Sequence, residues 1–578
     1  MRSLYKTSTV FIGVFLLMAV PGYAQQAADL PDAVKESIHQ RVDYSTDVGI
    51  VVGIIDEAGP RYYSYGRLAV SNDQPPDEHT VFEIGSISKV FTAILLADMA
   101  EHGELALDDP IQQYLPDDVT APTRNGQSIT LAHLSTHTSG LARMPDNFAP
   151  ANPSNPYADY TIEQLYDFLG RYTLPRDIGA EYEYSNLAVG LLGQLLARRA
   201  GMDYEGLVKA RLTDALGMTE TGITLTPAMQ DHLATGHANG IEVENWDIPT
   251  LAGAGALRST AHDMLRFLAA NMGLTETPLY AAMQTTHQTR VENAAGGMDV
   301  GLGWHIRKSD AAETVWHNGG TGGYRTFAGF VKGGNKGVVV LTNSTRGADD
   351  IGFHLLDPSF PLQPVKRSIA ATLQKTIDAE GMDAARRQYH DLKENQPNTY
   401  DFGESELNSL GYQYLRKDAV ETAIAIFKLN VEVFPEASNP YDSLGEAYME
   451  QGDTEQAIAN YKKSLDLNPG NANAVQMLAR MGETWTPDEV TVDPATLETY
   501  VGDYQLTPSF IITVTLEEGH LMAQATGQQK FEIFPKSETA FYYKVVDAQI
   551  TFNRNDAGAV ESLTLHQGGQ NVPGRKIK

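Results

Sequence analysis

The chain has 578 residues, a formal net charge of −30 and no cysteine. At about 100–200 residues per domain, this length predicts several domains. The acidic balance argues against nucleic-acid binding, which needs clustered Lys and Arg. The absence of cysteine excludes disulfides and a cysteine-linked lipid anchor. The apolar fraction of 42% is ordinary for a folded globular protein.

The first residues have the pattern of a signal peptide. Arg2 and Lys6 form a basic start, residues 10–20 are apolar, and small residues follow at the two positions that a signal peptidase reads. We therefore expect cleavage after Ala24, so that residues 1–24 are removed and the mature protein is exported, either periplasmic or secreted. The alternative is an uncleaved N-terminal anchor. No later run is long and apolar enough to predict a transmembrane helix.

Residues 28–360 have the pattern of one α/β domain. Residues 49–70 predict two β-strands around a turn, and the segment after Ser86 has apolar residues at helical spacing. Helices and loops follow to about residue 290, and residues 314–344 predict three strands with a tight glycine turn before the last. We expect the first and last strands to share one antiparallel sheet, flanked by helices and joined to a helical subdomain.

Residues 366–485 are predicted to be helical and contain a 34-residue repeat. The positions that recur are Leu410, Gly411, Tyr414, Ala423, Phe427 and Pro435, matched by Leu444, Gly445, Tyr448, Ala457, Tyr461 and Pro469. This period, with small residues where helices cross, is that of the tetratricopeptide repeat. A degenerate preceding copy and a trailing helix complete the stack. The repeats either bind a protein partner in a groove or serve as a spacer or oligomer contact, and their small number favours the spacer or oligomer contact.

Residues 490–578 have the pattern of a small antiparallel β-domain. Apolar and polar residues alternate along several short segments with turns between them. We expect a barrel or a sandwich, without a catalytic constellation.

Ser86 and Lys89 lie three residues apart in FEIGSISKVF, just before an apolar helix. Residues at this spacing share one helix face, so Lys89 can reach the Ser86 hydroxyl if Ser86 lies on the first turn. The free N–H groups and the partial positive charge at a helix start stabilise a developing oxyanion. They also favour the neutral form of a nearby lysine, which can then accept a proton. Such Ser–Lys pairs are also common on solvated helix surfaces. Other segments of the chain must therefore show whether this pair is catalytic.

Tyr184 and Asn186 form the second candidate segment, on a turn before an apolar helix. Both can point into one cleft. Tyr184 could shuttle a proton if a nearby lysine lowers its pKa, and the amide of Asn186 could hold a substrate carbonyl. The alternative is an ordinary helix start with a structural tyrosine.

His317, Gly319 and Gly320 form the third candidate segment, at the end of an apolar strand. Glycines there let a substrate backbone lie alongside, and one N–H can complete an oxyanion hole with that of Ser86. We expect His317 to sit over the same cleft. The alternative is a β-turn with a surface histidine.

In this chain order the three segments resemble the S-x-x-K, Y-x-N and K-T-G motifs of the serine β-lactamase and penicillin-binding-protein superfamily. The resemblance is closest to the class C β-lactamase-like branch, which includes esterases, D-aminopeptidases and D-alanyl-D-alanine carboxypeptidases. LAHLSTHTSGL at 131–141 and GLGW at 301–304 are also similar to that branch. The β-domain of residues 490–578 resembles those that often follow such secreted hydrolases.

The resemblance implies a role for each candidate residue. Ser86 is expected to be the acylated nucleophile, and Lys89 its activating partner. Tyr184 is expected to be the base for acylation and deacylation, and Asn186 to orient the substrate. His317 and Gly319 occupy the third motif, and the backbone of Gly320 is expected to form the oxyanion hole together with that of Ser86. The resemblance implies neither a cofactor nor a metal, and it makes His133 and His137 structural residues of the active-site rim.

His317 stands where the family has a lysine that helps to bind a substrate carboxylate. A mostly neutral histidine binds a carboxylate less well, and Arg325 is one candidate for compensation. We therefore expect an exported serine hydrolase of esters, amides or D-amino-acid peptides, whose partner is a small-molecule or peptide substrate. The alternatives are a true class C-type β-lactamase and a non-catalytic binding or sensing protein that uses the repeats. We find no H-E-x-x-H or comparable metal-ligand motif.

Overall fold

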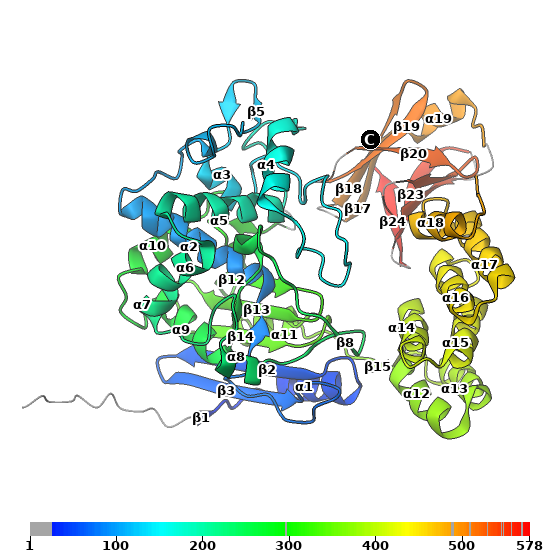
Figure 1. Cartoon of the computed structure of the whole chain (residues 1–578), viewed down its shortest axis with the longest axis horizontal. Coiled ribbons are helices and arrows are strands. Elements are labelled where there is room, and N and C mark those ends of the chain that lie inside the picture. The colour runs from blue at the N-terminus through cyan, green and yellow to red at the C-terminus, as the bar shows by residue number, and fades with distance from the viewer. Residues whose placement is uncertain are drawn as a thin grey trace, which may run out of the picture.

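A computed structural model describes residues 26–577, apart from residues 295–296, 487–489, 508–509, 527, 529, 545, 547, 556–557 and 568–569. The predicted signal peptide, residues 1–24, lies outside the described residues. Figure 1 shows an N-terminal α/β domain, a column of helices beside it and a C-terminal β-domain at the far end of that column. The predicted fold classes are therefore confirmed.

An eight-stranded sheet forms the centre of the α/β domain, and its neighbouring strands are antiparallel except for β1 and β3. The order is β1 (Gln26–Ala27), β3 (Gly59–Gly66), β2 (Gly49–Asp56), β14 (Gly337–Thr342), β13 (Arg325–Val331), β12 (Glu313–Gly320), β11 (His305–Lys308) and β10 (Asp299–Val300). β2 pairs with β14. The first and last parts of the domain thus share one sheet, as predicted.

Helices cover both faces of this sheet (Figure 1). α9 (Ala261–Met272) packs on one face, in the core that includes Val51. α1 (Asp32–Asp43) and α11 (Asp349–Leu356) contact the other side, where Val52 is buried in a separate core. Successive strand residues point to opposite faces, so a strand covered on both faces is apolar at every position rather than alternating.

α2 (Ser88–Glu101) lies at the centre of the helical part of the domain. It is buried continuously from Ser88 to Met99, which requires apolar residues on all its sides. The other helices here are α3 (Leu131–Ser135), α4 (Ile162–Arg171), α5 (Asn186–Ala200), α6 (Tyr204–Val208), α7 (Asp214–Leu216), α8 (Pro227–Asp231) and α10 (Tyr280–Thr286). The two-stranded ribbons are β4 (Phe82–Glu83) with β9 (Arg258–Ser259), β5 (Thr123–Arg124) with β6 (Gln127–Ser128), and β7 (Gly236–Ala238) with β8 (Ile241–Val243).

The repeat region is a stack of antiparallel helices. They are α12 (Ile369–Glu380), α13 (Met382–Asn395), α14 (Glu404–Leu415), α15 (Val420–Val433), α16 (Ser438–Gln451), α17 (Thr454–Leu467) and α18 (Ala472–Arg480), with the short pair β15 (Arg367–Ser368) and β16 (Tyr400–Asp401). A Cβ on Gly411 would lie 2.4 Å from the Phe427 ring, and one on Gly445 would lie 3.2 Å from the Tyr461 ring. The repeat therefore places a glycine against an aromatic ring at each crossing of paired helices.

The C-terminal domain is a closed barrel rather than a sandwich. Its strands are β17 (Gly502–Thr507), β18 (Phe510–Glu517), β19 (His520–Ala525), β20 (Phe531–Pro535), β21 (Ala540–Tyr543), β22 (Ala548–Arg554), β23 (Val560–Gln567) and β24 (Gln570–Lys576), preceded by α19 (Pro494–Tyr500). β17 pairs with β24, so the sheet has no free edge. Among the described residues, no helix combines the length and apolarity needed to span a bilayer.

Candidate active site

Ser86 and Lys89 meet where a short turn runs into the central helix. Ser86 lies in the 3-10 turn η1 (Gly85–Ile87), and α2 follows directly. Lys89 is wholly buried, and its Nζ lies 2.9 Å from Ser86 Oγ and 2.6 Å from the carbonyl oxygen of Ala254. Burial, and secondarily the positive charge of Arg143, lowers the pKa of Lys89 well below its usual 10.5. A neutral amine at this distance can accept the proton of the hydroxyl.

Tyr184 reaches Ser86 from the segment that precedes α5. Its ring centroid lies 4.9 Å from Lys89 Nζ. Burial raises the pKa of Tyr184 to about 12, although the nearby Ser86 hydroxyl and the charge of Arg143 act in the opposite direction. The predicted lowering of this pKa by a lysine does not occur, because Lys89 is itself uncharged at the pH where the phenol ionises. Tyr184 is therefore a protonated phenol near pH 7.

Ser86 opens onto a cavity of about 150 Å³. The lining residues are Gly85, Ser86, Arg143, Tyr157, Asn186, Trp246, Ile248, Ala254, Gly255, Gly320 and Thr321. Asn186 is the first residue of α5, and its Nδ2 lies 3.5 Å from the hydroxyl of Tyr157. Its Oδ1 is buried and has no hydrogen-bond partner among the described residues. Arg143 is the one charged side chain in this lining.

Two glycines bring the end of β12 against the Ser86 turn. Gly85 has a φ of +50°, a left-handed conformation that favours glycine. A Cβ on Gly85 would lie 2.7 Å from the backbone nitrogen of Gly320, and one on Gly319 would lie 2.0 Å from the carbonyl oxygen of Ile84. This backbone-to-backbone approach leaves no room for a side chain at either position. It places Gly320 beside Ser86 in the cavity wall.

His317 lies beside Tyr184 rather than in the cavity lining. Only 1% of His317 is exposed, its ring centroid is 6.2 Å from that of Tyr184, and it stacks on His305 at 4.6 Å. Burial lowers the pKa of His317 well below its usual range, and that of His305 to about 4. His317 is therefore neutral near pH 7. We expected His317 to sit over the cleft at Ser86. In the structure the cavity lining includes Gly320, three residues further along β12, but not His317.

The beta-lactamase family profile matches residues 36–355, which is more than half of the chain. The chain belongs to the beta-lactamase family. Residues 445–475 match a TPR repeat, and residues 486–575 match a domain of unknown function, DUF3471. The repeat match supports the assignment of the 34-residue period to tetratricopeptide repeats.

Known beta-lactamase family proteins cover the same part of the chain. The D-alanyl-D-alanine-carboxypeptidase/endopeptidase AmpH of Escherichia coli K12 is 28% identical over 360 residues, which cover 59% of this chain and 92% of AmpH. A beta-lactamase of the same organism is 28% identical over 348 residues, covering 54% of this chain and 88% of that protein. The crystal structure of a Pseudomonas syringae beta-lactamase/D-alanine carboxypeptidase shares the fold, with a TM-score of 0.50, 24% identity, and coverage of 57% of this chain and 98% of that one. The chain is thus a serine hydrolase of the penicillin-binding-protein and β-lactamase type.

The cation at the cavity of this beta-lactamase family member differs from the one that the sequence predicts. Arg325, the predicted substitute for the family's lysine, does not line it, because its guanidinium donates to the carbonyl oxygens of Thr321 and Tyr324. Arg143 lines it instead, two residues after the HTSGL segment. Its position two residues after LAHLSTHTSGL, a segment that resembles the family, is the sequence feature that could have indicated a place at the cavity.

The aromatic lining was also missed by sequence analysis. Tyr157 and Trp246 lie in long irregular connections and are in ring contact at 5.3 Å. They are 89 positions apart in the chain (246 minus 157), so no local pattern indicated that they meet.

Proposed function

We propose that this protein is an exported hydrolase that forms an acyl-enzyme on Ser86. The observation that carries the proposal is the buried Lys89 amine, with its lowered pKa, 2.9 Å from the Ser86 hydroxyl. A buried lysine with a lowered pKa can be neutral and can therefore act as a base. Its amine lies next to Ser86, the one serine in the cavity lining.

The proposed reaction begins with transfer of the Ser86 proton to Lys89. Ser86 Oγ forms a bond to the substrate carbonyl carbon, and the negative charge on the carbonyl oxygen is stabilised by the backbone N–H groups of Ser86 and Gly320. Tyr184, a protonated phenol beside Ser86, passes a proton to the leaving amine or alkoxide and is reprotonated from Lys89. The bond to the leaving group then breaks. Water releases the acyl group from Ser86 by the same proton path in reverse.

The proposed substrate is a small peptide with a terminal carboxylate, such as one ending in D-alanine. Arg143 provides a guanidinium at the cavity for the carboxylate, and Asn186 can donate to a substrate carbonyl through its amide. AmpH, a relative, carries the name of a D-alanyl-D-alanine carboxypeptidase and endopeptidase. In this proposal His317 supports Tyr184 from behind and Gly319 allows the close approach of β12.

The second candidate is a true class C-type β-lactamase, which the relatives named beta-lactamase favour. Arg143 would serve a β-lactam carboxylate as well as a peptide carboxylate, so we rank this candidate second only because neutral His317 stands where the family's third motif has its lysine. We expect turnover of D-alanyl peptides and short nitrophenyl esters to exceed that of a chromogenic cephalosporin. The opposite ranking would establish the β-lactamase instead.

Active-site labelling tests the acyl-enzyme. A fluorophosphonate or a fluorescent penicillin should label the wild-type chain and the Ser64→Ala control, whose serine is exposed on β3, but not Ser86→Ala. If neither probe labels the wild type, the protein is better explained as a binding protein that uses its repeats.

We also propose the division of the chain and its destination. Residues 1–24 are the export signal, 28–360 the hydrolase, 366–485 the repeats and 490–578 the barrel domain. The signal-like pattern of the first residues supports export. Mass spectrometry of the mature protein should find Gln25 at its N-terminus, in a periplasmic or secreted fraction. The repeats are assigned as a spacer or an oligomer contact, and binding of a different protein by residues 366–485 would change that assignment.

A further inference from the structure

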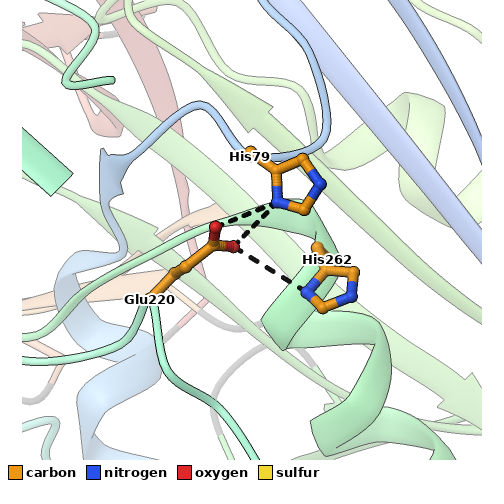
Figure 2. A group of neighbouring side chains, drawn as sticks. All are labelled: His79, Glu220 and His262. Carbon is orange, nitrogen blue, oxygen red and sulfur yellow. Dashed lines mark hydrogen bonds and ion pairs between the residues drawn. The ribbon is translucent and has the colours of Figure 1, made fainter. Parts of the chain in front are cut away.

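Three side chains with metal-binding chemistry meet outside the cavity at Ser86 (Figure 2). His79 Nδ1 lies 3.0 Å from both carboxylate oxygens of Glu220, and His262 Nδ1 lies 3.8 Å from Glu220 Oε2. One ligand atom of each residue lies within 4.8 Å of the other two. Neighbouring ligands of a tetrahedral zinc ion are about 3.3 Å apart, given bonds of about 2.0–2.1 Å. The cluster therefore needs only small side-chain shifts to surround an ion.

Backbone hydrogen bonds hold the three segments together independently of any ion. β4, which follows His79, pairs with β9, which precedes His262. Gly222 exchanges two backbone hydrogen bonds with Arg258, at 3.0 and 2.8 Å, and thereby brings Glu220 to the same ribbon. The backbone nitrogen of His262 also donates to the carbonyl of Glu78. Because the backbone is already ordered, an ion would have to order only side chains.

Further polar groups orient the ligands in the manner of outer-shell partners at metal sites. The carboxylate of Glu78 lies 3.8 Å from Nε2 of His79, the ring nitrogen that does not face Glu220. Thr260 Oγ1 donates to Glu220 Oε2 at 3.1 Å, and the backbone nitrogen of Glu220 donates to the buried Asp263 at 2.7 Å. The three candidate ligands keep 39%, 29% and 34% of their side chains exposed, which leaves an entry path and room for water.

We propose that His79, Glu220 and His262 bind one divalent transition-metal ion of the zinc type, with water completing its coordination. Two imidazoles and one carboxylate suit Zn²⁺ or Co²⁺, whereas Mg²⁺ and Ca²⁺ prefer oxygen ligands alone. The ion would link the segment just before β4 with the start of α9, just after β9, and with the loop that holds Glu220. Ser86 follows β4 by three residues, and Ala254, whose carbonyl accepts from Lys89, lies four residues before β9. The ion is thus structural and supports the active site without contacting substrate.

Metal titration of the full chain without an affinity tag tests the proposal. After treatment with a chelator, calorimetry should show one Zn²⁺ bound per chain and thermal unfolding should shift to higher temperature, with little response to Mg²⁺ or Ca²⁺. Co²⁺ should give the visible absorption of a site with nitrogen and oxygen ligands. Glu220→Gln and His262→Ala should weaken Zn²⁺ binding by about 100-fold or more, and Glu78→Gln by about tenfold, because even outer-shell changes cost about 10- to 100-fold.

His520→Ala is the matched control. His520 lies 2.9 Å from Glu532, so it is also a histidine–carboxylate pair, but it belongs to no three-ligand group among the described residues. This variant should keep the wild-type affinity. The proposal is overturned if the wild type binds no stoichiometric Zn²⁺, in which case the three residues form ion pairs only, or if Glu220→Gln and His262→Ala bind it equally well. These readouts do not depend on whether Ser86 is acylated.

Discussion

The amine of Lys89 lies 2.9 Å from the hydroxyl of Ser86, although Lys89 has no exposed surface. An ammonium removed from water in this way is costly unless a counter-charge accompanies it, and the pKa of Lys89 is lowered accordingly. The proposed nucleophile and its proposed base therefore lie together at a single helix start.

Replacing Lys89 by arginine should abolish most of the activity. Arginine keeps the positive charge and cannot give up its proton, so it cannot act as the base for Ser86. We expect kcat/KM for a D-alanyl peptide to fall by about 10²- to 10⁴-fold, the range for loss of general-base catalysis. Lys35→Arg, at a lysine paired with the exposed Asp29, is the control and should behave like the wild type. Near-normal turnover by Lys89→Arg would remove the lysine from the mechanism.

The pH profile of kcat/KM should have an acid limb set by Lys89. Because burial lowers its pKa, the amine becomes protonated and inactive only as the pH falls well below 10.5. Tyr184, with a pKa of about 12, should cause no alkaline loss below about pH 10. Steady-state rates across the pH range of stable protein check both limbs. Activity that still rises several-fold per pH unit near pH 10 would mean that Lys89 titrates like an ordinary lysine.

Stability should depend on pH through the same residue. Unfolded Lys89 takes up a proton below pH 10.5, whereas folded Lys89 does so only below its lowered pKa. Between these two pKa values the unfolded chain binds more protons, so the wild type gains stability as the pH rises. Relative to Lys89→Met, the gain should approach about 1.4 kcal/mol per pH unit. Denaturant unfolding of both proteins at two pH values measures it, and a constant difference would contradict the prediction.

Arg143 should control the affinity for substrates with a carboxylate. Removing its charge in Arg143→Ala should raise KM for a peptide with a free carboxylate by about 10- to 100-fold, the typical value of a hydrogen bond to a charged group. KM for an uncharged nitrophenyl ester should change little. Arg171→Ala, which removes an exposed arginine paired with Asp146, is the control. An equal loss with both substrates would instead indicate a structural role beside Tyr184.

Gly319 should tolerate no side chain. The Cβ of Gly319→Ala would lie 2.0 Å from the carbonyl oxygen of Ile84, so β12 and the Ser86 turn must separate. We expect a destabilisation of about 1–3 kcal/mol, as for other overpacked sites, together with lower kcat. Gly347→Ala is the matched control, since nothing lies within 4 Å of its added Cβ. Thermal unfolding and ester hydrolysis of both variants provide the comparison.

The repeats show how far periodicity alone can specify packing. Gly411 and Phe427 recur as Gly445 and Tyr461 after 34 residues, and in the structure each glycine faces its aromatic partner. Each contact lies within one helical hairpin, so the two residues are close in sequence and the repeat period predicts their packing.

The C-terminal barrel is different, because the alternation of apolar and polar residues predicts strands but does not predict that the first and last strands pair. Pairing of β17 with β24 joins the two ends of the domain, and no local pattern distinguishes that from a sandwich.

The amino-acid order by itself determined the helix start at Ser86 and Lys89, the turn before α5 at Tyr184, the sheet that unites both ends of the domain, and the family resemblance. These features depend on periodicity and on spacings of a few residues. Tertiary structure alone decided that His317 lies behind Tyr184, that Arg143 supplies the cation at the cavity, and that His79, Glu220 and His262 come together. Such groups come from segments separated by tens to hundreds of positions, and only the packing of those segments sets which side chains face one another.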